Sequence, residues 1–257
     1  MSRDISHILD GWDFEPGEVQ VRIVKGDDGR DKIQLRLDLG LLQMELDGRP
    51  DGKRPENHAS WLEYYRQRQQ EYEALNPDSP PFRLDAVACE RLLREGVQYY
   101  HRYLSFWHLQ RYELCARDTN RNLRLFQFVR EHARHEEDKR RFDQWRPYVT
   151  LMHTRAVATP LVEIGVLDAA LTAIEAGIRG IERFLEEYDQ TDQADQCQEL
   201  SQLRHWRDEV QAQAVKRLPP VVPSPLDNLR RQLAEAVAEE QFEKAARIRD
   251  EIKRMSE

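Results

Sequence analysis

A long central stretch of helical periodicity constrains the fold of this 257-residue chain more than any other feature. Between residues 57 and 216, apolar side chains recur at intervals of three and four, and few prolines or glycines interrupt them. This spacing places the apolar side chains on one face of each helix, and those faces must pack against one another. The stretch therefore predicts a mainly α-helical protein, built as a helical bundle or a short irregular solenoid.

Breaks in the pattern predict where the individual helices lie. Turns at 76–81, Asp118-Thr119, Pro147, Pro160 and 189–195 interrupt the stretch, with Gly165 as a further candidate break beside Pro160. The expected helices cover residues 59–75, 85–115, 119–144, 148–158, 160–188 and 193–216. In this interpretation Asp118 and Thr119 cap the third helix.

The N-terminal part carries a β-strand pattern instead. Apolar residues alternate with polar ones at 19–23, a turn follows at Asp28-Gly29, and the alternation resumes at 33–39. At Gly40 the apolar residues move from odd to even positions, which predicts a β-bulge or a bend. We expect a two- or three-stranded antiparallel ribbon that packs on the helices, since so small a ribbon is not stable alone.

A proline-rich segment at 218–225 separates the helical stretch from a short tail. Four of its residues are prolines, which favour an extended, semi-rigid spacer. The sequence thus predicts four parts: an N-terminal β-ribbon region at 1–52, a helical domain at 53–217, the linker at 218–225 and the tail at 226–257.

The tail contains two apolar stripes at helical spacing, which predict two short helices folded back on each other. The stripes are Leu226, Leu229, Leu233 and Val237, then Ala245, Ile248, Ile252 and Met255. Because a hairpin of this length buries little apolar area, it is marginal alone. We therefore expect it to dock onto a protein surface.

The tail also resembles a known family. Phe242-Glu243, Ala245-Ala246, Arg249-Asp250 and Ile252 follow the core of the UVR motif, which is named from the excision-nuclease subunits UvrB and UvrC and recurs in Clp-type ATPases. The resemblance implies an antiparallel helical hairpin that binds other proteins, often a second UVR hairpin. The residues expected to carry the contact are Leu229, Leu233, Phe242, Ala245, Ala246, Arg249, Asp250 and Ile252.

Two segments of the helical stretch resemble tetratricopeptide repeats. Ala173 and Gly177 precede bulky Ile181, and residues 109–123 show a similar mixture of small and large side chains. No period of about 34 residues can be read. A degenerate repeat and an irregular bundle both remain open.

Charge argues against a nucleic-acid partner. The formal net charge of the chain is -8, and an acidic protein repels phosphate unless it carries a local basic stripe. The basic run at 139–141 directly follows the acidic run at 136–138, which cancels its field. We do not expect DNA or RNA binding.

The sequence favours a cytoplasmic protein. Its three cysteines form no CxxC pair and no disulfide framework, as is typical of a reducing compartment. The first residues are acidic and lack the apolar run of a signal peptide. No window approaches the roughly 18 apolar residues that a membrane span needs.

The sequence contains no catalytic motif that would identify an enzyme. His132 and His135 stand three residues apart on a predicted helix, but their charged neighbours are typical of a solvated face rather than of a metal site. We predict no metal and no cofactor. Arg117, Arg121 and Arg124 either line a groove that accepts a peptide or acidic ligand, or belong to a helix cap with local ion pairs.

These observations favour a non-enzymatic adaptor or scaffold, which uses its tail to bind a protein partner or a second copy of itself. One alternative is a ligand-binding or enzymatic helical domain with a regulatory tail. Its expected site is an aromatic pocket around Tyr99, Tyr103, Trp107 and His108. Another alternative, drawn only from the resemblance of the tail, is an accessory factor of excision repair or of a Clp-type protease.

Overall fold

The computed structural model describes residues 4–217 and, within the tail, residues 229, 232, 233, 235, 247–249, 251, 252, 254 and 255. The protein forms two compact units, Met1–Ala212 and Gln213–Glu257. The described elements confirm a mainly α-helical protein with an N-terminal three-stranded antiparallel sheet. The proposed linker at 218–225 lies outside the described residues, and the division of the chain into four parts stays a prediction.

The N-terminal sheet is a simple meander that follows α1 (Ser6–Leu9). Its strands are β1 (Val21–Lys25), β2 (Asp31–Leu37) and β3 (Gly40–Glu45), in the order β1-β2-β3. Ile33 in β2 pairs with Ile23 on one side and with Met44 on the other. Ile33, Leu35 and Met44 are buried, so the sheet presents one apolar face to the rest of the unit.

The change of phase at Gly40 comes from a hairpin turn. Leu37 pairs with Gly40, so Asp38 and Leu39 alone form the connection. The expected bulge or bend within a strand is therefore wrong. A two-residue loop pairs odd positions of β2 with even positions of β3, and this pairing keeps apolar side chains of both strands on the same face.

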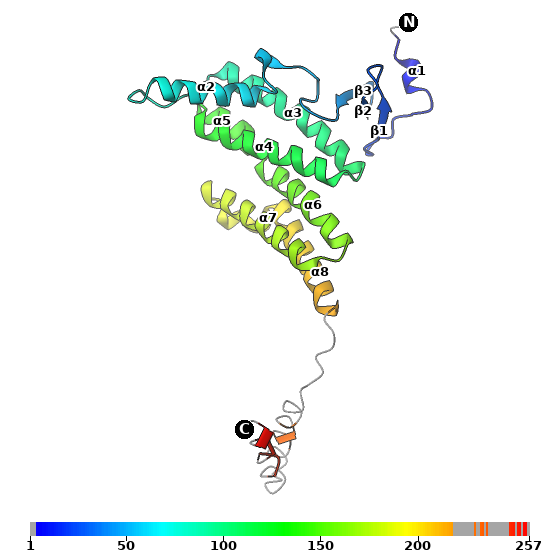
Figure 1. Ribbon diagram of the computed structural model, residues 1–257, viewed down its shortest axis with the longest axis vertical. Coiled ribbons are helices and arrows are strands. Elements are labelled where there is room, and N and C mark those ends of the chain that lie inside the picture. The colour runs from blue at the N-terminus through cyan, green and yellow to red at the C-terminus, as the bar shows by residue number, and fades with distance from the viewer. Residues whose placement is uncertain are drawn as a thin grey trace. The chain divides into compact units, whose positions relative to one another are not determined.

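The first helices are α2 (Trp61–Leu75), α3 (Ala86–His108), α4 (Tyr112–His132) and α5 (Glu136–Asp143), after a short 3-10 turn η1 (Pro55–Asn57). Ser60 and Asp85 cap α2 and α3, because their side chains accept hydrogen bonds from Glu63 N–H and Ala88 N–H. The apolar face of the sheet and these helices share one hydrophobic core. Figure 1 shows the sheet beside α3, and α3 contacts β2.

Two predicted helix boundaries in this region are wrong. The break expected near residue 118 lies at 109–111, where Gln110 adopts a left-handed φ of 56°. Asp118 and Thr119 therefore lie inside α4, where both are buried, and neither caps a helix. The helix expected at 119–144 is divided at Ala133, because Leu84 N–H donates to His132 O at 2.8 Å and Arg134 N–H donates to Leu84 O at 3.1 Å.

The second half of the unit contains α6 (Arg146–Glu163), α7 (Leu167–Glu187), η2 (Thr191–Gln196) and α8 (Gln198–Arg217). Pro147 occupies the first turn of α6, where proline has no hydrogen bond to lose. The break expected at Pro160 is wrong, because Pro160 lies inside α6. The chain turns instead at the other candidate, Gly165, whose φ is 80°. α3, α4, α6 and α7 follow one another across the unit (Figure 1), each in contact with the next.

Candidate functional site

The described residues of the tail form a small apolar cluster between two helical segments. Leu229 and Leu233 from the first segment pack against Ile248, with Ile252 one turn further along the second. Ile248 is 7% exposed, whereas Leu229, Leu233 and Ile252 are only partly buried and Met255 is 52% exposed. The described part of the tail thus has an apolar face that it covers incompletely.

The structure places some of the predicted contact residues of the tail. Leu229, Leu233 and Ile252 come together in this cluster, and Arg249 beside Ile248 is exposed. Four further predicted contact residues lie outside the described residues: Phe242, Ala245, Ala246 and Asp250.

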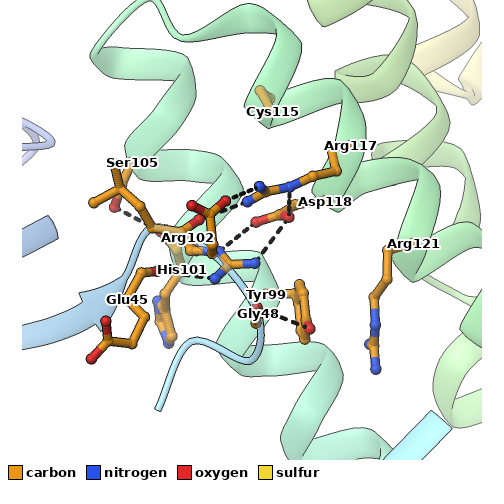
Figure 2. Close-up of polar contacts among 12 residues, drawn as sticks. Glu45, Gly48, Tyr99, His101, Arg102, Ser105, Cys115, Arg117, Asp118 and Arg121 are labelled. Carbon is orange, nitrogen blue, oxygen red and sulfur yellow. Dashed lines mark hydrogen bonds and ion pairs between the residues drawn. The ribbon is translucent and has the colours of Figure 1, made fainter. Parts of the chain in front are cut away.

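In the first compact unit, Met1–Ala212, which we call the helical unit, a buried ion pair joins α3 to α4 (Figure 2). Arg102 Nε lies 2.6 Å from Asp118 Oδ2 and Arg102 Nη2 lies 3.0 Å from Asp118 Oδ1, with both side chains 1% exposed. Arg102 Nη1 also donates to the backbone carbonyl of Glu45 at 2.9 Å. One guanidinium therefore links two helices to the last strand of the sheet.

A second buried carboxylate holds the start of α2. Glu95 in α3 is fully buried and accepts hydrogen bonds from Trp61 N–H at 2.7 Å and Leu62 N–H at 3.2 Å. Glu95 also forms an ion pair with Arg121. The carboxylate satisfies free backbone donors at a helix N-terminus, where negative charge is favourable.

Sequence reasoning missed these two carboxylate-centred contacts. The available signal is that charged residues stand within buried helical stripes: Arg102 lies between Tyr99, Tyr103 and Phe106, and Asp118 stands beside Cys115. Long charged side chains are rarely fully buried unless they are paired. The signal indicates that a partner exists, but it does not identify the partner.

The predicted arginine groove lies on α4, and two of its three members already bind carboxylates of this chain. Arg117 contacts Asp47 at 2.6 Å and Asp118 at 3.0 Å. Arg121 pairs with Glu95 and stacks over the ring of Tyr99 at 4.0 Å, whereas Arg124 is exposed. Long-range ion pairs thus take the place of a helix cap, and ligand binding by the three arginines stays a prediction.

An apolar cavity of about 430 Å³ lies among α3, α4, α5 and α6. Its lining includes Tyr100, Tyr103, Tyr148, Trp145 and Val97. Of the four residues predicted for an aromatic pocket, only Tyr103 lines it. Tyr99 turns toward the ion pairs and its hydroxyl donates to Gly48 O at 3.3 Å, and Trp107 packs against Tyr112 with ring centroids 5.3 Å apart.

The histidines and cysteines that the sequence offers for chemistry lie in packed surroundings. The ring of His132 packs against Phe82 and Phe128, and Cys89 and Cys115 are buried. Within the described residues, no group of three or more histidine, cysteine or acidic side chains is arranged to hold a metal ion. The basic run at 139–141 also contacts acidic neighbours: Lys139 pairs with Glu136 at 2.6 Å, and Arg141 pairs with Glu90 at 3.2 Å.

The described residues of the tail thus form short helical segments with an incompletely covered apolar face. Residues 224–257 match the UVR family, described as the UvrB/uvrC motif, which confirms the resemblance of the tail. Nothing else in the chain is recognised, and comparisons with curated proteins and with solved structures gave no match. Among the described residues, no helix is both long and apolar enough to cross a membrane.

Proposed function

We propose that this protein is a non-enzymatic adaptor whose UVR tail docks onto a second protein in the cytoplasm, either another UVR-containing protein or a second copy of this chain. The UVR match at 224–257 carries the proposal, since the motif suggests a protein-interaction segment. The described tail supports it, because Ile248 alone among its described apolar residues is well buried. A partner that covers Leu229, Leu233 and Met255 removes this apolar surface from water.

The proposal is tested by Phe242→Asp in the full-length chain. We expect the variant to lose the partners that the unaltered protein retains on co-purification, and to lose any self-association measured by sedimentation equilibrium. A charge at this position of the motif opposes burial in an interface. Gln232→Asp, at an exposed position of the same tail, is the matched control and should retain both.

Two measurements separate loss of docking from loss of folding. Far-ultraviolet circular dichroism and thermal unfolding of the helical unit should be unchanged in Phe242→Asp. Retention of the same partners and the same mass in solution by Phe242→Asp contradicts the adaptor role. Partner identity also tests the excision-repair and Clp-type alternatives, which rest on the resemblance of the tail alone.

The apolar cavity supports a second candidate, a helical domain that binds an apolar ligand. Aromatic side chains dominate its lining, as in many small-molecule sites, and Val97 at its edge is 47% exposed. Val97→Trp should reduce binding of an apolar fluorescent dye to the full chain. Val166→Trp, at an equally exposed valine outside the cavity, should leave it unchanged. Equal dye binding by both variants contradicts this candidate.

A further inference from the structure

A groove of about 550 Å³ crosses the helical unit over α6, with α4 and α7 as its walls. Figure 1 shows α4, α6 and α7 in succession. Arg146, Thr150, Thr154 and Val157 of α6 line its floor at the spacing of one helix face. α7 lines one wall from Ala173 to Glu187, which is about 21 Å at 1.5 Å per residue. The groove is therefore elongated.

The two ends of the groove differ in chemistry. Near Val157 the wall of α7 consists of the small residues Ala173, Ala176 and Gly177, and Thr154 of α6 packs closely against Gly177. At the opposite end stand Arg130, Arg146 and Arg183 together with Glu187. One end of the groove is thus uncharged and lined by small side chains, and the other end is rich in guanidinium groups.

Carboxylates of this chain bind the arginines at the charged end only partly. Arg146 Nη2 lies 2.6 Å from Glu187 Oε2 and 3.1 Å from Asp143 Oδ2. Arg130 Nη1 lies 3.4 Å from Glu187 Oε2 and 3.6 Å from Asp143 Oδ2. Two donors, Arg130 Nη1 and Arg146 Nε, and one acceptor, Asp143 Oδ1, are nevertheless buried and make no hydrogen bond to the described residues. Such donors gain free energy from an added acceptor.

The charge balance at this end favours an anion. Three guanidinium groups face two carboxylates, those of Asp143 and Glu187, in a chain whose formal net charge is -8. Arg183 Nε donates a hydrogen bond to Arg179 O at 3.4 Å. Burial lowers the pKa of His153, which also lines the groove, so this histidine adds no charge near pH 7.

We propose that this groove binds an acidic peptide segment of a partner protein, with a ligand carboxylate replacing that of Glu187 on Arg130 and Arg146. Glu187 is the last residue of α7 and its side chain is 45% exposed, so it can turn into solvent without disturbing a core. A groove of this length fits an extended chain, whereas a phosphate ion contacts only its charged end. The site is separate from the proposed docking of the tail.

Fluorescence anisotropy with the full-length chain tests the proposal. The probe is a labelled oligoglutamate of about seven residues, since an extended chain covers roughly 3.3 Å per residue. We expect binding that weakens as salt is added, because salt screens exposed charges. Arg183→Gln should weaken binding by about two- to fivefold, as expected for one exposed ion pair.

Glu187→Gln should tighten binding by a similar factor, and a gain of affinity cannot result from misfolding. The matched controls are Arg179→Gln and Glu186→Gln, which make the same charge changes at exposed positions of α7 outside the groove. Both should leave the affinity unchanged, and so should Phe242→Asp in the tail. Equal effects of Arg183→Gln and Arg179→Gln, or competition by inorganic phosphate as strong as that by unlabelled peptide, overturn the proposal.

Discussion

Arg102 of α3 and Asp118 of α4 form a buried ion pair between the two helices, joined by hydrogen bonds of 2.6 and 3.0 Å. The ring centroids of Tyr99 and Phe106 lie 4.8 and 5.9 Å from the guanidinium carbon of Arg102. The third nitrogen of the group donates to Glu45 O. All three guanidinium nitrogens of Arg102 donate hydrogen bonds to other residues of this chain (Figure 2). We therefore assign the pair a structural role, which is to hold the sheet against the helices, rather than a role in ligand binding.

Asp118→Asn should therefore destabilise the helical unit strongly. The substitution leaves Arg102 buried without its countercharge, a change that typically costs about 3–5 kcal/mol in free energy of unfolding. Urea denaturation followed by circular dichroism measures the loss. Asp47→Asn removes an exposed partner of Arg117 and should cost far less. Similar losses in the two variants contradict a structural role for the buried pair.

The contact between α6 and α7 gives a second prediction. A Cβ atom added at Gly177 would overlap Thr154 Oγ1 and lie 2.9 Å from its Cγ2. Gly177→Ala should therefore lower the free energy of unfolding by about 1–3 kcal/mol, as overpacking of a core does. Differential scanning calorimetry of the full chain detects the change.

Gly180→Ala is the matched control, since its Cβ would meet Thr150 Cγ2 at 3.3 Å and gains the helix propensity of alanine. We expect little net change in stability. The double variant Gly177→Ala with Thr154→Ala should recover part of the loss, because the clashing hydroxyl and methyl are gone. No recovery would show that the close approach at Gly177 does not determine the packing of the two helices.

The fold class and the tail could be predicted from the sequence because both depend on local patterns. The helical spacing of apolar residues at 57–216 corresponds to helices in the structure, and the alternation of apolar and polar residues at 19–46 corresponds to the sheet. Helix boundaries could not all be predicted: Gln110 takes a left-handed conformation without a glycine, and Pro160 stays inside α6. Such details depend on tertiary contacts that local spacing does not encode.

The polar sites depended on contacts between residues far apart in the sequence. Asp47 and Arg117 are 70 residues apart, and Arg146 and Glu187 are 41 apart. The sequence indicated the polar cluster around Arg117, but it could not show which carboxylates approach it. The groove over α6 was missed for the same reason, because its walls come from three helices.

Burial should control the reactivity of the thiols. Cys89 and Cys115 are 0% exposed, and burial raises the pKa of each thiol to about 12, whereas Cys197 is only partly buried. Ellman's reagent near pH 8 should therefore modify Cys197 first, and the other two only as the protein unfolds. Cys197→Ser should remove the fast phase. A fast phase that persists in this variant contradicts the burial of Cys89 and Cys115.

Buried histidines should make the protein less stable as the pH falls from 7 to 5. Burial lowers the pKa of His101 and of His153 below the usual value of 6.5. In this range the unfolded chain takes up protons that the folded chain does not, so the free energy of unfolding decreases with falling pH. Carboxylates with lowered pKa, such as Glu187, lose their contribution only below about pH 4.5.

Urea denaturation at several pH values between 5 and 7 measures the slope of the free energy of unfolding against pH. His101→Gln and His153→Gln should each reduce it, and the double variant should reduce it further, because glutamine binds no proton in either state. His153 faces Thr119 Oγ1 at 3.0 Å, so its replacement lowers stability at all pH values. The slope, and not the stability at pH 7, therefore decides the result. An unchanged slope in the double variant would show that other groups cause the acid sensitivity.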